Sequence, residues 1–204
     1  MASPLAAGGY GVNVMPKRVA ILGSGRGTNA RAICSYAAQH PAEYSVSLVV
    51  STNATAGICS VASTFHVPVE VLDYGTEFGT QLTDLIRAYQ IDVLVLAGFL
   101  KLLPSKVIDV LQGNVLNIHP ALLPEFGGKG MYGIHVHRAV IASKAGFTGA
   151  TVHVVSDVYD DGAIVAQRRI QVPADISPEE LQLRVQSVEH DLFPEAIAVF
   201  IRNR

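Results

Sequence analysis

The chain has 204 residues, a length that favours a single domain, and half of its residues are hydrophobic. The formal net charge of −2 gives no general attraction for nucleic acid or an anionic membrane, so an anionic ligand must be bound by local geometry. No apolar run approaches the roughly 20 residues that span a bilayer. The only two cysteines, Cys34 and Cys59, lack metal-ligand spacing and fit reduced, buried thiols of a cytoplasmic protein.

Residues 1–16 are small and glycine-rich, and they lack the basic start and apolar core of a secretory signal. We expect them to form a disordered extension. We expect residues 17–204 to form one domain.

After this extension, apolar runs alternate with amphipathic segments. Strands are predicted at 19–22, 45–51, 67–72 and 92–97, and helices at 29–39, 55–66 and 81–89. Strands that alternate with helices in this way are typical of a parallel sheet covered on both faces.

The pattern changes in the second half of the chain. A helix is predicted at 104–111, a strand at 115–119, a Gly/Pro-rich loop at 120–132, a helix at 137–144, strands at 150–156 and 164–172, and a helix at 177–202. The last two strands have no helix between them, so they should pair antiparallel. Ser177 and Glu180 predict a capping box on the final helix, which Pro194 should kink or divide. The expected fold is therefore α/β and Rossmann-like, with a mostly parallel sheet, helices on both faces and antiparallel C-terminal strands.

The loop at 23–29, Gly-Ser-Gly-Arg-Gly-Thr-Asn, joins the first strand to the first helix. Its three glycines allow close backbone approach and positive φ, while Thr28 and Asn29 can cap the helix and donate to a phosphate. The loop lacks the third glycine of a dinucleotide fingerprint and the lysine of a Walker A motif. It predicts a phosphate site of another kind, the alternative being a tight turn that binds nothing.

Asn117 and His119 lie two positions apart on the predicted strand 115–119. Residues at this spacing share a face, so both side chains should point into the crevice at the carboxyl ends of the strands. The amide can donate to a developing oxyanion, and the imidazole can handle a proton near neutral pH. The pair indicates a catalytic site, the alternative being a structural histidine at a strand end.

Five segments spread over residues 17–202 carry a family resemblance. They are the glycine loop, VLAGFLKLL at 95–103, LNIHPALLP at 116–124, GATVH at 149–153 with the acidic turn 157–162, and RVQSVEH at 184–190. Together they resemble the phosphoribosylglycinamide formyltransferases, folate-dependent enzymes of purine biosynthesis. This family transfers the formyl group of 10-formyltetrahydrofolate, a co-substrate, to the amine of glycinamide ribonucleotide (GAR).

The resemblance implies the formyltransferase fold and a catalytic trio of Asn117, His119 and Asp160. The choice of Asp160 over Asp157 and Asp161 rests on the family's Asp-x-x-Asp pattern. The residues implied to bind GAR are Gly27, Thr28, Asn29, Gln186, Ser187, Val188 and Glu189, the last on the ribose. Those implied to bind the folate are Leu100, Lys101, Leu102, Leu103, Asn117, Ser156, Asp157, Val158, Tyr159 and Asp160. The stretch 74–79 lacks an arginine that the family places near the folate, so the folate tail should be held differently.

The expected partners are small-molecule substrates, with no nucleic acid and no membrane, and the expected assembly is a monomer or homodimer. No metal is expected, and His135 and His137 are interpreted as loop and helix-start residues rather than half of a metal site. The glycine-dense segment 125–133 is expected to be a mobile lid. The alternatives are a formyltetrahydrofolate hydrolase or a methionyl-tRNA formyltransferase, both expected to need a further domain, and a non-catalytic nucleotide-binding module.

Overall fold

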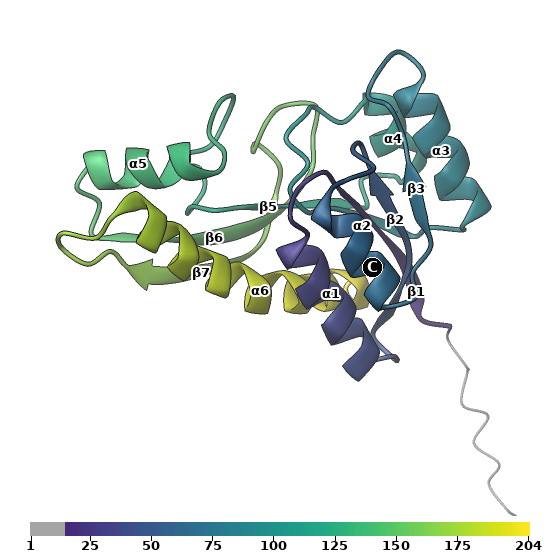
Figure 1. The fold of residues 1–204 in the computed structure, drawn as a ribbon, viewed down its shortest axis with the longest axis horizontal. Helices are drawn as coiled ribbons and strands as arrows, with labels where there is room; N and C mark the ends of the chain where they lie inside the picture. The colour runs from purple at the N-terminus through teal and green to yellow at the C-terminus, as the bar shows by residue number, and fades with distance from the viewer. Residues whose placement is uncertain (1–14) are drawn as a thin grey trace, which may run out of the picture.

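The computed structural model describes residues 15–204, so nearly all of the predicted disordered extension lies outside the described residues. Seven strands form one sheet in the order β3-β2-β1-β4-β5-β6-β7 (Figure 1). The strands are β1 (Lys17–Gly23), β2 (Tyr44–Ser51), β3 (Val69–Val71), β4 (Val93–Leu96), β5 (Val115–His119), β6 (Phe147–Val154) and β7 (Ile164–Gln171). The helices are α1 (Thr28–Gln39), α2 (Gly57–Thr64), α3 (Phe78–Ala88), α4 (Ser105–Val110), α5 (Ile134–Ala142) and α6 (Pro178–Arg202).

The strand directions confirm the predicted fold class. The first five strands pair parallel, whereas β6 is antiparallel to β5 and β7 is antiparallel to β6. The chain moves outward from β1 to β3 and then returns to β4 on the other side of β1. Loops that leave β1 and β4 at their carboxyl ends therefore diverge, which creates the crevice where sheets of this kind bind ligands.

Two apolar layers enclose the sheet. Alternate strand residues such as Ile21 and Val95 pack with α1, α2, α5 and α6, and their neighbours Leu22 and Leu94 pack with α3 and α4. Figure 1 shows α1, α2 and α6 together on one face, with α3 and α4 beyond the opposite face. Burial on both faces explains why the central strands are almost continuously apolar.

Several element boundaries differ from the sequence prediction. The second helix begins at Gly57 rather than Thr55, and α5 begins at Ile134 rather than His137. Strand β6 begins three residues before Ala150, at Phe147. The early start is possible because Gly149 packs directly against the Arg168 carbonyl of β7, where no side chain fits.

The last helix confirms one prediction and excludes one of the two alternatives in another. Ser177 and Glu180 form the predicted capping box, in which each side chain bonds to the other residue's backbone N–H. Pro194 does not divide the helix, which is continuous from Pro178 to Arg202. Both cysteines are free, but only Cys34 is buried, so the prediction that Cys59 is a buried thiol was wrong. Within residues 15–204, no helix has the length and apolar character needed to cross a membrane.

Candidate functional site

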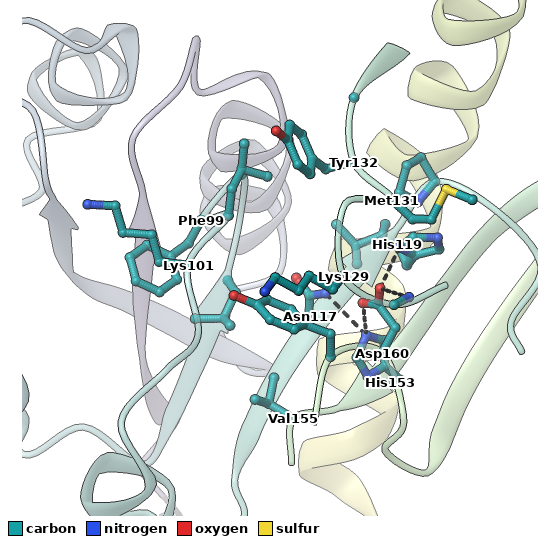
Figure 2. A pocket seen from close by; sticks show the side chains of 18 of the residues that line it. Phe99, Lys101, Asn117, His119, Lys129, Met131, Tyr132, His153, Val155 and Asp160 are labelled. Atoms are coloured by element: carbon teal, nitrogen blue, oxygen red, sulfur yellow. Dashed lines mark hydrogen bonds and ion pairs between the residues drawn. The ribbon is translucent and has the colours of Figure 1, made fainter. Parts of the chain in front are cut away.

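A cavity of about 540 Å³ lies at the carboxyl ends of β4 and β5 (Figure 2). This volume is in the range of small-molecule sites. Its walls come from the β4–α4 connection, the end of β5, the segment 128–133, the acidic turn after β6, and α6. Residues far apart in the sequence thus meet at the crevice that the strand order creates.

Asn117 and His119 both line this cavity, as their shared face on β5 predicts. His119 is only 3% exposed, whereas Asn117 is half-buried. Thr151 pairs with His119 across the β5–β6 ladder, and its hydroxyl donates to the Ala121 carbonyl at 2.7 Å. The same hydroxyl accepts from the Leu123 N–H at 3.0 Å. The loop that follows β5 is therefore fixed at its start.

Asp160 is the one aspartate of the acidic turn that reaches these side chains. Its Oδ2 lies 3.3 Å from His119 Nδ1, and its Oδ1 lies 3.5 Å from His153 Nε2. Asp157 and Asp161 are exposed. Figure 2 shows Asp160 between the two imidazoles, with Asn117 beside His153.

The environment of the trio shifts two pKa values downward. Burial lowers the pKa of His119, and the nearby Asp160 carboxylate and Phe126 carbonyl offset this only in part. Burial alone would raise the pKa of Asp160, but the imidazoles of His153 and His119 and the Gly128 N–H lower it below its ordinary value. At neutral pH the site therefore pairs an ionised carboxylate with a neutral imidazole.

The glycine-dense segment 125–133 is bonded to the same two residues. His119 Nε2 donates to the Phe126 carbonyl at 2.8 Å, and the Gly128 N–H donates to Asp160 Oδ2 at 2.9 Å. Both nitrogens of His119 thus face acceptors within the protein. Any movement of this segment would change the hydrogen bonds of both titratable groups.

The glycine loop and α6 meet at the other end of the cavity. Gln186 Nε2 donates to Thr28 Oγ1 at 2.9 Å, and Asn29 Nδ2 donates to Glu189 Oε2 at 2.8 Å. Burial raises the pKa of Glu189, and the Asn29 hydrogen bond offsets this in part. The first turn of α1 is thereby tied to one face of α6.

Two expectations about the glycine loop were wrong. Gly27, rather than Thr28 or Asn29, is the N-cap of α1, and the cap has no side-chain hydrogen bond. The side chains of Thr28 and Asn29 instead contact α6, as described above. Of the loop's three glycines, only Gly27 has a positive φ, at 79°. The first turn of a helix has N–H groups without intrahelical partners, which is the feature that suits helix N-termini to anions.

Most of the residues implied to bind ligands lie on the cavity wall, but five do not. Those on the wall, besides Asn117, His119 and Asp160, are Asn29, Leu100, Lys101, Leu102, Leu103, Ser156, Val158, Tyr159, Gln186 and Glu189. Those outside its lining are Gly27, Thr28, Asp157, Ser187 and Val188. Val188 packs against the apolar core and Ser187 is exposed, because helical spacing turns both away from the face that carries Gln186 and Glu189.

Other wall residues had no role assigned from the sequence. His153 is 2% exposed and contacts Asn117 and Asp160, while Phe99, Met131, Tyr132 and Gln182 are among the other lining residues. Antiparallel pairing was predicted only for the last two strands, so the antiparallel pairing of β5 with β6 and its register are findings of the structure. That register sets His153 opposite Asn117.

His137 lies on the cavity wall in the first turn of α5 and is 1% exposed. Its Nδ1 is buried without a hydrogen-bond partner. Within the described residues 15–204, no three His, Cys, Asp or Glu side chains are grouped so that they could hold a metal ion. The polar groups on the cavity wall include the Asn117 amide, the imidazoles and the Asp160 carboxylate.

An amide donor, a buried imidazole and a carboxylate beside a cavity, with a helix N-terminus at its far end, define a group-transfer site on an α/β sheet. The chain belongs to the formyl transferase family, whose model matches residues 17–197. This membership confirms the family resemblance of the sequence motifs.

Individual relatives agree with this assignment. The chain is 38% identical over 194 residues to the chloroplastic phosphoribosylglycinamide formyltransferase of Arabidopsis thaliana, covering 92% of this chain and 66% of the relative. It is 31% identical to the phosphoribosylglycinamide formyltransferase of Haemophilus influenzae, covering 92% of this chain and 89% of the relative. The chain thus spans about two thirds of the length of the Arabidopsis relative and most of the bacterial one.

A solved structure agrees as well. Glycinamide ribonucleotide transformylase 1 from Symbiobacterium toebii superposes with a TM-score of 0.87 at 30% identity, covering 94% of this chain and 90% of that one.

Proposed function

We propose that the protein transfers the formyl group of 10-formyltetrahydrofolate to the amine of GAR, giving formylglycinamide ribonucleotide and tetrahydrofolate in purine biosynthesis. The observation that carries the proposal is the convergence of Asn117, His119 and Asp160 beside one cavity. The printed names of the relatives support the choice of acceptor. Intact trio residues argue against a non-catalytic module.

GAR is proposed to bind at the end of the cavity formed by α1 and α6. The N-terminus of α1 reaches this end through Asn29 and would suit a phosphate, since a first helical turn combines free donors with the helix dipole. Glu189 is proposed to accept from the ribose hydroxyls. Its hydrogen bond from Asn29 fixes the carboxylate for that purpose.

The folate is proposed to bind along Leu100–Leu103 and the turn that ends at Asp160. Leu100 and Leu102 are exposed apolar side chains on the cavity wall, which suits a flat aromatic ligand. Lys101 places its ammonium 4.1 Å from the centre of the Tyr74 ring. The cavity volume of about 540 Å³ is compatible with a drug-sized ligand.

In the proposed reaction the amine nitrogen of GAR attacks the formyl carbon directly. A C–N bond to the amine forms, the bond from the formyl carbon to folate N10 breaks, and the amine proton passes to N10. Asn117 donates to the tetrahedral oxyanion, a contribution of about 3–4 kcal/mol for one such donor. No metal or covalent enzyme intermediate enters this scheme.

His119 is proposed to support the oxyanion charge and to relay the proton, with Asp160 stabilising the protonated ring. Because Nε2 donates to the Phe126 carbonyl, the relay requires the segment 125–133 to release this nitrogen during turnover. Proton handling of this kind contributes about 10²–10⁴-fold. The predicted lid therefore has a defined task, which is to expose the imidazole once the ligands are bound.

A turnover assay with 10-formyltetrahydrofolate, in the presence and absence of GAR, tests the proposal. Release of tetrahydrofolate only when GAR is present is the expected result. Release without GAR would instead identify a hydrolase. The absence of release under both conditions, with GAR binding retained, would identify a non-catalytic module.

Assembly and location are proposals of the same kind. A monomer or homodimer is the proposed assembly. Two free cysteines favour a reducing compartment such as the cytoplasm, whereas the Arabidopsis relative is named chloroplastic. Expression of a fluorescent fusion in the source cell would decide between these locations.

A further inference from the structure

We propose that His153 is a positioning residue that sets which way the side-chain amide of Asn117 faces. This inference rests on the proposed function, since it assigns the amide nitrogen of Asn117 to the oxyanion. The reaction as written above gives His153 no part. Its surroundings are nevertheless specific, because it is almost fully buried and has a polar neighbour at each nitrogen.

The pairing of β5 with β6 brings the two side chains together. Asn117 and His153 are direct partners in this antiparallel ladder, so their side chains leave the sheet on the same face. Asn117 Nδ2 lies 3.1 Å from His153 Nε2. This distance is that of a hydrogen bond, and only one of the two nitrogens can be its donor at a time.

The other ring nitrogen decides the direction of that bond. His153 Nδ1 lies 2.9 Å from the Val154 carbonyl, which can only accept. The Nδ1 atom must therefore carry a proton. In the neutral ring Nε2 then has a free lone pair, and Asn117 donates to it through one of its two amide protons.

The Asp160 carboxylate favours the opposite proton position on His153. Its Oδ1 lies 3.5 Å from Nε2, which favours a proton on that nitrogen. The proton that the Val154 carbonyl requires on Nδ1 leaves Nε2 of the neutral ring without one, so Nε2 accepts from Asn117 and makes no hydrogen bond to Asp160. A doubly protonated ring would instead turn the amide oxygen of Asn117 toward His153.

The direction of the amide matters for the reaction. With its nitrogen facing His153, Asn117 keeps a second N–H for a ligand in the cavity that it lines. With the amide reversed, the Asn117 oxygen would take that place and would repel a developing oxyanion. With Nδ1 donating to the Val154 carbonyl and Nε2 accepting from Asn117, His153 selects the donor orientation before the substrate arrives, which is the condition for preorganised stabilisation.

The test combines two substitutions of His153 with Asn117→Ala. His153→Leu removes the lone pair, and His153→Gln keeps an oxygen that can accept from Asn117. We expect His153→Leu to lower kcat about 10- to 100-fold, less than the 10²–10³-fold loss of a whole oxyanion donor, with KM for GAR changed less than about threefold. We expect log kcat of His153→Gln to lie at least halfway from the value for His153→Leu back to that of the unsubstituted protein.

The double variant separates positioning from an independent role. In the Asn117→Ala background, His153→Leu should lower kcat by less than about twofold, because there is no amide left to orient. A full multiplicative loss in that background would overturn the proposal. In a second double-mutant cycle, His153→Leu is combined with Asp160→Asn, and we expect the two losses in kcat to be closer to multiplicative. Strong coupling in this cycle, with none in the Asn117 cycle, would mean that His153 acts through the Asp160 carboxylate.

A second measurement does not depend on activity. The Asn117 side-chain amide protons, followed by ¹H–¹⁵N NMR, should shift upfield in His153→Leu and stay near their original position in His153→Gln. Unchanged Asn117 resonances in His153→Leu would overturn the proposal even if turnover fell. If the unsubstituted protein showed no GAR-dependent turnover, the proposed function would fail, whereas the amide orientation would still be decided by these resonances.

Discussion

The Gly128 N–H and the Asp160 carboxylate, 32 residues apart, share a hydrogen bond of 2.9 Å. Both residues have positive φ values, 96° for Gly128 and 56° for Asp160. A side chain at the neighbouring Gly127 would meet Leu123 and the β-carbon of Asp160. The glycine-dense segment and the acidic turn therefore hold each other in place, and the titration of Asp160 is connected to the backbone of the proposed lid.

The first prediction concerns Asp160 and pH. Because the Asp160 carboxylate raises the pKa of His119 against the effect of burial, Asp160→Asn should lower that pKa further. The acid limb of the kcat/KM profile reports loss of the neutral imidazole, so it should move to lower pH while kcat falls about 10²-fold or more. Initial rates between about pH 5 and 8 would measure both effects.

The same turn supplies a matched control for this experiment. Asp161→Asn removes one exposed carboxylate next to Asp160. This variant should keep kcat within about twofold and leave the acid limb in place. A displaced limb in the control would show that net charge near the cavity, rather than the contact with His119, sets the pH dependence.

The second prediction concerns Asn117. Asn117→Ala should lower kcat about 10²–10³-fold with KM for both substrates nearly unchanged, because the lost donor acts on the transition state. Steady-state kinetics, together with binding of each ligand by calorimetry, would check this. Near-normal turnover with both ligands bound would remove Asn117 from the proposed mechanism.

The third prediction concerns Glu189 on α6. Glu189→Gln keeps an oxygen for Asn29 but loses the charge that strengthens hydrogen bonds to ribose hydroxyls. KM for GAR should rise about 10- to 100-fold, while KM for the folate stays within about twofold. Leu183→Ala is a control on the same helix, since this side chain is 63% exposed. An equal rise for both substrates would contradict the proposed division of the cavity.

The fourth prediction compares two glycines of one loop. A β-carbon at Gly27 would lie 2.7 Å from Ile58 Cα, and its φ of +79° strains any other residue. Gly27→Ala should therefore lower the free energy of unfolding by at least about 1–2 kcal/mol and raise KM for GAR. A β-carbon at Gly25 has no neighbour within 4 Å, so Gly25→Ala should be nearly neutral. Urea denaturation of both variants would test the difference.

The fifth prediction concerns the buried His137. Burial and the charge of His119 lower its pKa to about 4, below the ordinary value of 6.5. Between these values the unfolded chain binds a proton that the folded chain does not, so stability must fall as the pH falls. His137 should contribute up to about 3 kcal/mol to this fall. His137→Gln should reduce the difference in unfolding free energy between pH 7.5 and 4, whereas the exposed His135→Gln should not.

The sequence predicted the parallel half of the fold because its physical signal is simple. Strands such as 93–96 are buried on both faces, which makes them apolar throughout, and the amphipathic helices between them force parallel pairing. The predicted starts of α5 and β6 were wrong because glycines near these starts permit backbone geometry that other residues do not. Gly133 allows α5 to begin directly after a glycine-rich run, and Gly149 sits inside a strand where its neighbour leaves no room for a side chain.

The sequence predicted Asn117 and His119 from spacing on a strand, and Asp160 only through the family pattern. The local sequence pattern could not supply the contacts between residues that lie far apart in the chain. Hydrogen bonds that join Thr28 to Gln186 and Asn29 to Glu189 span about 160 residues and redirect side chains that local rules would use as helix caps. The position of His153 depended on strand register, which composition and periodicity leave open.

The direct pairing of Asn117 with His153 also limits how this chain can change in length. One extra residue within β5 or β6 would turn one of the two side chains to the other face of the sheet. Extra residues in the connections at 120–133 and 155–163 would leave the ladder intact, but they would displace the Phe126 and Gly128 backbone groups or Asp160 itself. Insertions and deletions that preserve activity should therefore be absent from these two strands and from both connections.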